Sequence, residues 1–147
     1  MSVSVVDSVE LANRLRPVLL LLNRHLRREA HAAGVTGGQA ALLGQIRHNP
    51  QLGVKELAAR EGISAPSMTR YLDRMERAGL IVRMRSAEDG RRIRIALTPK
   101  GVRVLRSVRR RRTAWLAERL DGLSPSDQRA VSDAIEPLAL LLEEGDR

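Results

Sequence analysis

Arginine is concentrated in one part of the chain, around the stretch RSAEDGRRIRIALTPKG at residues 85–101. Residues 83–112 contain twelve Arg or Lys and two acids, a net charge of +10 in a chain whose total is +9. The SAEDG cluster lies between two short apolar runs and predicts a β-hairpin tip that carries Asp89, Arg91 and Arg92. An arginine on a projecting hairpin suits the minor groove of DNA where that groove is narrow and electronegative. These residues therefore point to nucleic-acid binding.

A second group of polar residues lies on the segment ISAPSMTRYLDRMERAGL, residues 63–80. Ser64 is placed to cap a helix, with Pro66 in the first turn, where its missing N–H costs little. Three apolar residues at i, i+4 and i+7 predict the buried face: Met68, Leu72 and Met75. The outer face carries Pro66, Ser67, Arg70, Arg74 and Arg77. A short helix at 54–61 that ends at Gly62 precedes it, which completes a helix-turn-helix pattern.

Four consecutive arginines occupy residues 109–112 of a predicted helix. Four helical positions sweep about 300° around the axis, so one of them must point where the helix packs. That residue is Arg112, seven after Leu105 and four before Leu116 on the apolar face. An ion pair within the protein, or an aliphatic stem that carries the charge out to solvent, is the plain expectation for such an arginine.

The sequence contains no arrangement of residues typical of catalysis. It has no recognisable catalytic triad, phosphate-binding glycine loop or nucleophile elbow. His25 and Glu29 have the i, i+4 spacing of a metal pair, but without obvious further ligands a surface pair is the simpler interpretation. The absence of cysteine excludes disulfides, thiolate metal sites and a cysteine-oxidation switch. No enzymatic activity, metal or other cofactor is expected.

The composition is that of a folded protein with an aliphatic core. Of 147 residues, 43% are hydrophobic and 29% charged, and Tyr71 and Trp115 are the only aromatic residues. The first ten residues lack the basic and apolar regions of a secretory signal. The longest apolar run, residues 17–22, is too short to span a bilayer. We therefore expect a cytoplasmic protein with no membrane partner.

The spacing of apolar and capping residues predicts the order α-α-α-α-β-β-α-α. Helices are expected at 7–32, 36–49, 54–61, from Ser64, at 98–120 and from Ser124, with strands at 80–84 and 92–97. Ile93, Ile95 and Leu97 are expected to anchor the hairpin, and Pro17 and Pro137 to bend their helices. The first helix has a broader apolar face than one neighbouring helix needs, which fits packing against a second subunit.

A helix-turn-helix followed directly by a basic hairpin predicts a winged helix, and residues 62–101 also resemble a known family. They are similar to the MarR (multiple antibiotic resistance regulator) family of bacterial transcription factors. Five residues follow the wing pattern of that family: Asp89, Arg91, Leu97, Thr98 and Gly101. The resemblance extends over nearly the whole chain and is closest from 35 to 120. It implies a mainly α winged helix-turn-helix fold with a small β-hairpin wing, assembled as a homodimer.

The resemblance also implies a division of the chain into functional parts. Residues 35–100 would form the DNA-binding domain and 101–120 a linking helix, while 1–34 and 121–147 would form the dimerisation helices. The partners implied are a second copy of the chain and double-stranded DNA with a pseudo-palindromic operator. The function implied is sequence-specific transcriptional regulation.

Individual contacts with DNA are carried over residue by residue. In the family the wing arginine enters the minor groove, which gives this role to Arg91, with Asp89 orienting it and Arg92 as the next candidate. On the second helix of the motif the residues expected to face DNA are Ser64, Pro66, Ser67, Thr69, Arg70 and Arg74. Arg70 is expected to contact a base, and the others phosphates or bridging waters. Solvated surface charge is the alternative to DNA contact for Arg74, Arg77 and Arg91, and a plain turn residue is the alternative for Asp89.

A regulatory ligand is implied as well. Members of the family bind small anionic or phenolic effectors between the DNA-binding and dimerisation lobes. On this resemblance Arg112 would face that cleft, pair with an effector carboxylate and so release a repressor from DNA; activation is the alternative outcome. A ligand-independent or architectural DNA-binding protein is the alternative function. A membrane-surface role for the Arg-rich helix is disfavoured because Arg112 interrupts its apolar face.

Overall fold

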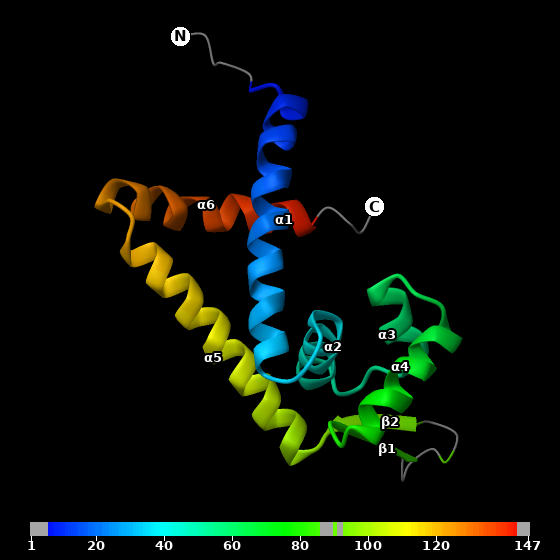
Figure 1. The fold of residues 1–147 in the computed structure, drawn as a ribbon. Helices are drawn as coiled ribbons and strands as arrows, with labels where there is room; N and C mark the ends of the chain where they lie inside the picture. Colours follow the sequence, from blue (N-terminus) through cyan, green and yellow to red (C-terminus); the bar gives the residue numbers. More distant parts are fainter. Residues whose placement is uncertain (1–5, 86–89, 91–92, 144–147) are drawn as a thin grey trace. The chain divides into compact units, whose positions relative to one another are not determined.

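The computed structural model describes residues 6–85, 90 and 93–143, which fold into six helices and a two-stranded sheet (Figure 1). The helices are α1 (Ser8–Ala32), α2 (Gly37–His48), α3 (Val54–Glu61), α4 (Ala65–Arg77), α5 (Pro99–Asp121) and α6 (Pro125–Glu143). The strands are β1 (Ile81–Arg85) and β2 (Ile93–Leu97). This is the predicted order, α-α-α-α-β-β-α-α. The chain divides into two compact units, residues 1–112 and 113–147.

Predicted capping residues mark the start of α2, the end of α3 and the start of α4. Thr36 and Gln39 form a capping box in which each side chain accepts a backbone N–H of the other at 3.0 Å. Gly62 ends α3 with a left-handed φ of 67°, a conformation that costs glycine nothing because it lacks a Cβ. Ser64 begins α4, its hydroxyl accepting from Ser67 N at 3.2 Å. These caps place α3 and α4 as a helix-turn-helix.

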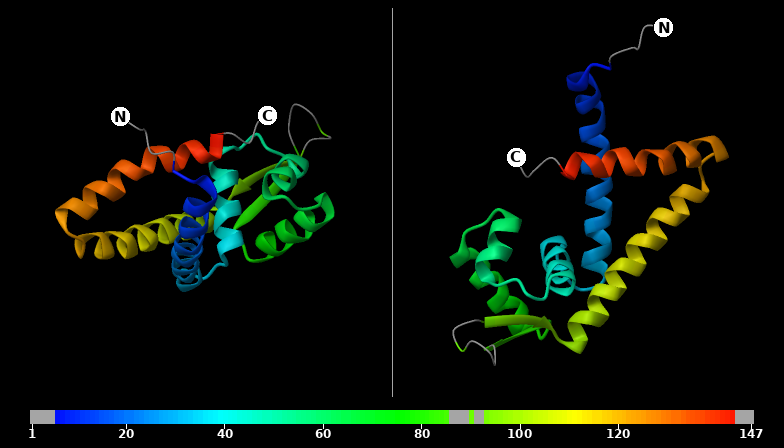
Figure 2. Two further views of the ribbon diagram at one scale, coloured as in Figure 1. Left: turned by 90° about the horizontal axis from the view of Figure 1, so that it is seen from above. Right: turned by 180° about the vertical axis from the view of Figure 1, so that it is seen from behind.

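The core of the first unit lies between α2, α3, α4, the hairpin and the start of α5. Its fully buried large side chains are Leu43, Leu57, Met68, Leu72, Met75, Ile81, Ile95 and Val108. Figure 2 shows α3 and α4 next to each other, with the hairpin beside α4. All of these core residues are aliphatic or methionine, as the scarcity of aromatics requires. Met68, Leu72 and Met75 are the α4 residues in this list, and they are the three residues predicted from the i, i+4, i+7 spacing.

The hairpin is anchored at its base rather than along its whole length. β1 and β2 are antiparallel, and Ile81 and Ile95 are only 1% and 2% exposed. Ile93, however, is 47% exposed, so the prediction that it anchors the hairpin is wrong. It pairs with Arg85, at the end of the hairpin far from the core. Alternation assigned Ile93 to the side of the sheet that Ile95 occupies, but it cannot indicate how far the core extends beneath that side.

Hydrogen bonds of Thr98 connect the end of α4, the start of β1 and the start of α5. The Thr98 hydroxyl donates to Gly79 O at 2.6 Å and accepts from Gly101 N at 3.0 Å. Thr98 N donates to Leu80 O at 3.0 Å. Gly101 is buried, and a Cβ there would lie 2.1 Å from Leu80 O. The Thr-Pro-Lys-Gly sequence therefore caps α5 and lets the start of that helix approach the backbone that follows α4.

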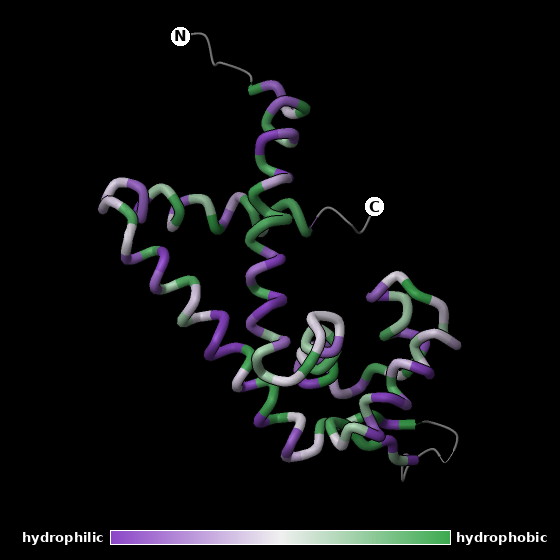
Figure 3. Tube along the Cα trace, in the orientation of Figure 1, coloured by the Kyte–Doolittle hydropathy of each residue, from purple (hydrophilic) through white to green (hydrophobic). Residues whose placement is uncertain are grey.

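The first helix is long and carries exposed apolar residues in its middle. It continues through Pro17 without a break. Five consecutive apolar residues, 18–22, are between 38% and 62% exposed. Figure 3 shows this apolar segment as a green section in the middle of α1. Contiguous exposed apolar surface of this kind commonly marks an interaction surface.

The second unit contains the end of α5 and the whole of α6. Ser124 caps α6 as predicted, its hydroxyl accepting from Asp127 N at 3.1 Å, and the helix continues through Pro137. The guanidinium of Arg119 lies over the ring of Trp115, 4.0 Å from its centroid. Within the described ranges, none of the helices has an apolar stretch long enough to cross a membrane.

Candidate nucleic-acid interface

The outer face of α4 presents polar and basic side chains to solvent. Burial of its opposite face against the core fixes the rotation of the helix about its axis, since Met68, Leu72 and Met75 are each at most 1% exposed. The predicted contact residues Ser64, Pro66, Thr69, Arg70 and Arg74 are exposed, and Ser67 is half-buried. The structure thus brings these six residues together on one accessible face of one helix.

The N-terminal turn of α4 forms a short hydrogen-bonded chain that ends at Arg70. The Ser64 hydroxyl donates to Ser67 Oγ at 2.9 Å, and Arg70 Nη2 donates to the same oxygen at 3.3 Å. Thr69 Oγ1 donates to Ala65 O at 3.0 Å, so its proton is used within the helix. The helix N-terminus is where recognition helices reach base edges. The Ser67 bond partly orders the Arg70 guanidinium at that end.

Another arginine near α4, not among the residues singled out from the sequence, forms salt bridges with acids. Arg83 on β1 forms salt bridges with Asp73 and with Glu76, both on α4; the Nε to Glu76 Oε2 distance is 2.9 Å. These hydrogen bonds, that of Glu76 first, raise the pKa of Arg83 above its ordinary value. The signal was present in the sequence, because strict alternation from the buried Ile81 places Arg83 on the inward side of its strand.

The wing residues of the prediction lie outside the described residues. Asp89, Arg91 and Arg92 are in this group. The described strand ends beside them carry Arg85 and Arg94, both exposed.

Arg112 points to α1 rather than to a carboxylate. Its Nε donates to the main-chain oxygen of Leu26 at 3.0 Å, and the side chain is half-buried. Burial, and after it the charge of Arg27, lowers the pKa of the Arg112 guanidinium. Its neighbour Arg111 makes the contact with an acid, at 3.9 Å from Glu29 Oε2. The prediction that Arg112 faces inward is right, and its partner is a backbone carbonyl.

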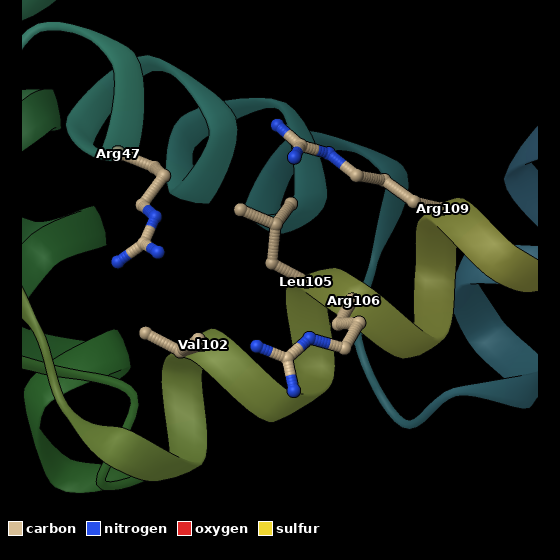
Figure 4. Close-up of a pocket in the computed structure, with 5 residues that line it drawn as sticks. All are labelled: Arg47, Val102, Leu105, Arg106 and Arg109. Carbon is tan, nitrogen blue, oxygen red and sulfur yellow. The ribbon is translucent and has the colours of Figure 1, made fainter.

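A hollow of about 160 Å³ between α2 and the first turns of α5 is lined mainly by cations. Val102 and Leu105 form its apolar part, and Arg47, Arg106 and Arg109 supply three guanidinium groups. Figure 4 shows Arg47 and Arg106 extending from the two helices into the space between them. Arg109 donates to His48 Nε2 at 2.7 Å. In the part of the chain that the structure describes, none of the three arginines forms a salt bridge.

The described residues contain no cluster of three or more acidic, histidine or cysteine side chains that could hold a metal ion. His25 and Glu29 therefore gain no third ligand from this part of the chain.

A helix-turn-helix followed by a basic antiparallel hairpin defines a winged-helix protein. Among sequence families, the model of the MarR family matches residues 35–93. An uncharacterised HTH-type transcriptional regulator of Mycobacterium bovis, Mb0904, is 29% identical over 95% of this chain and 99% of its own length. A MarR family protein of Bacillus stearothermophilus has the same fold, with a TM-score of 0.81 and 26% identity over 92% of this chain and 95% of that one. A protein of Pseudomonas aeruginosa PA01 is 33% identical over 97% of this chain and 99% of its own, with a TM-score of 0.78.

The chain belongs to the MarR family of winged helix-turn-helix transcriptional regulators. The predicted fold and family are thereby confirmed. The family and these relatives are regulators of transcription and not enzymes, which agrees with the absence of a catalytic motif in the sequence.

Proposed function

We propose that the protein binds double-stranded DNA sequence-specifically as a homodimer and represses transcription until a small anionic or phenolic effector releases it. The outer face of α4 carries this proposal. It places Arg70, Arg74 and two serines on the exposed side of a helix whose other side is fixed in the core. A helix of this kind fits the major groove, where base edges can be distinguished by hydrogen bonds.

The proposed roles follow the position of each residue on α4 and on the wing. Arg70, at the N-terminal half of α4, contacts a base; Ser64, Pro66, Ser67, Thr69 and Arg74 line the same surface and contact phosphates or bridging waters. In the wing, Arg91 enters the minor groove with Asp89 orienting it, and Arg92 stands next to it in the sequence. The net charge of +9 supplies the attraction to the phosphate backbone.

Dimerisation is proposed through residues 1–34 and 121–147, with 35–100 as the DNA-binding domain and 101–120 linking them. The exposed apolar segment 18–22 of α1 supports this assignment, because a second subunit would remove it from water. Two recognition helices in one dimer would read two half-sites about one helical turn apart.

An anionic effector is supported by three neighbouring arginines that form no salt bridge with any residue the structure describes. The hollow between α2 and α5 presents Arg47, Arg106 and Arg109 over an aliphatic floor, a setting that suits a carboxylate attached to an apolar body. Arg112 remains the residue proposed to pair with an effector carboxylate, for which it would exchange its bond to the Leu26 carbonyl. A ligand lowers DNA affinity only if it binds the released state more tightly than the DNA-bound state.

Selection of duplexes from a random-sequence pool with the full chain tests the proposal. We expect enrichment of an inverted repeat whose half-site centres are about 10 bp apart. Addition of benzoate or salicylate to the purified complex is expected to release the selected duplex. A pool that remains random after repeated rounds would overturn sequence-specific binding. A selected duplex that no carboxylate or phenol releases would overturn the effector alone.

A further inference from the structure

The contact between Arg83 and α4 links the first wing strand to the recognition helix. Arg83 Nε donates to Glu76 Oε2 at 2.9 Å, while Nη2 donates to Asp73 Oδ1. The two acids are three residues apart, so one planar guanidinium spans nearly one turn of the helix. A guanidinium presents its donors in a fixed fork, which makes such a two-acid contact directional as well as electrostatic.

The position of Asp73 on α4 gives this contact a consequence for DNA binding. Asp73 lies four residues after Thr69 and three after Arg70, so it shares the outer face of the helix with them. A carboxylate on that face repels phosphates and competes for neighbouring arginines. Between Ala65 and Arg77 the helix carries three arginines and two acids, and both acids are the partners of Arg83.

The arginine side of the contact is held more firmly than a surface side chain. The side chain of Arg83 is 25% exposed, against 40% for Asp73 and 42% for Glu76. Arg83 also pairs in the sheet with Ile95, which is 2% exposed, so its backbone is part of the core structure. A paired, partly shielded guanidinium on fixed backbone can hold the side chains of a helix in place better than a freely solvated pair.

We infer that Arg83 is a positioning residue of the DNA interface: it holds Asp73 and Glu76 against the wing strand and so keeps α4 aligned with that strand for base recognition. The inference rests on the proposed function. It predicts that loss of Arg83 lowers discrimination between sequences, whereas loss of an ordinary surface arginine lowers affinity for all DNA alike. Arg85 is the matched control, since it lies on the same strand, is exposed and has no salt bridge with any described residue.

The test compares Kd for a duplex selected by the wild-type full chain with Kd for a random-sequence duplex of equal length. Arg83→Gln is expected to weaken binding to the selected duplex about tenfold or more and to lower the selected-to-random ratio. Arg85→Gln is expected to weaken both by a similar factor and to leave the ratio unchanged. Arg83→Lys keeps the charge but cannot fork to two acids, so it is expected to lower the ratio while preserving affinity for random DNA.

A variant that also neutralises Asp73 and Glu76 separates a positioning effect of Arg83 from an effect of its charge. Arg83→Gln combined with Asp73→Asn and Glu76→Gln is expected to bind random DNA more tightly than Arg83→Gln alone, because no carboxylate is left unmasked, while the selected-to-random ratio stays low. Urea unfolding of each variant identifies any that are unfolded under assay conditions, in which case Arg83→Lys decides the result.

Two results would overturn the inference. A ratio for Arg83→Gln or Arg83→Lys equal to that of the wild type would remove the positioning role. A decrease of about one in the salt slope with Arg83→Gln, not recovered in the triple variant, would make Arg83 a direct phosphate contact. If the wild-type chain itself shows no preference for the selected duplex, the proposed function fails, and the inference with it.

Discussion

Replacement of Gly101 by alanine tests the close approach between the start of α5 and the backbone that follows α4. The added Cβ would lie 2.1 Å from Leu80 O and 3.1 Å from Leu80 C, both main-chain atoms. Ordinary contacts begin near 3.4 Å, so one of the two backbones must move by more than an ångström. Leu80 O is also the acceptor of the 3.0 Å bond from Thr98 N, which such a movement would break.

The expected loss of stability follows from three contributions. Forcing an extra methyl into a packed site costs about 1–3 kcal/mol. Loss of the Thr98 to Leu80 hydrogen bond adds about 1 kcal/mol. Alanine recovers about 1 kcal/mol over glycine by helix propensity. We therefore expect Gly101→Ala to lower the free energy of unfolding by about 1–3 kcal/mol, and Tm by roughly 3–10 °C for a chain of this size.

Gly44 offers a matched control within α2. A Cβ at Gly44 would meet no atom within 4 Å, so Gly44→Ala is expected to raise the free energy of unfolding by about 0.5–1 kcal/mol. Urea and thermal unfolding followed by circular dichroism measure both variants. Opposite signs for the two substitutions are predicted. A Gly101→Ala protein as stable as wild type would refute the close approach and the account of the Thr-Pro-Lys-Gly sequence.

Three further substitutions test the interface and the effector. Arg91→Ala should weaken binding to a selected duplex by about 1–3 kcal/mol and reduce the salt slope by about one; a titration with unchanged affinity and slope would remove Arg91 from the site. Ser64→Ala should lower the free energy of unfolding by about 1 kcal/mol through loss of the α4 cap. It should also weaken DNA binding, because it removes the hydroxyl that donates to Ser67 Oγ. Unchanged urea unfolding would contradict the capping role of Ser64. Arg112→Ala should abolish release of the duplex by benzoate or salicylate while leaving DNA affinity without ligand near the wild-type value. Release that persists in this variant would exclude Arg112 from the effector site.

Local signals in the sequence were sufficient for the element boundaries around the helix-turn-helix. Thr36 with Gln39, and Ser64 with Pro66, each act within three residues of the helix start. Such caps depend on nearby backbone alone, so their geometry follows from sequence. The spacing of Met68, Leu72 and Met75 fixed the buried face of α4 for the same reason.

Long-range features were predicted only in part. The inward position of Arg112 followed from the apolar face of its helix, but its acceptor, Leu26 O, lies 86 residues away and is a backbone atom with no sequence signature. Alternation places Arg83 on the inward side of its strand but does not indicate its partners, because Asp73 and Glu76 become neighbours of Arg83 only when the strand folds back along α4. Alternation predicts that Ile93 belongs to the core, but alternation indicates only the side of the sheet on which a residue lies and not whether the core extends beneath it.

The ratio of specific to non-specific DNA affinity tests the central claim most directly. Kd would be measured by fluorescence anisotropy at physiological salt for a selected duplex and for a random-sequence duplex of the same length, with the full chain. A sequence-specific regulator is expected to prefer the selected duplex by about 10³-fold or more. A ratio near one would contradict the account and would indicate an architectural protein whose binding depends on charge alone.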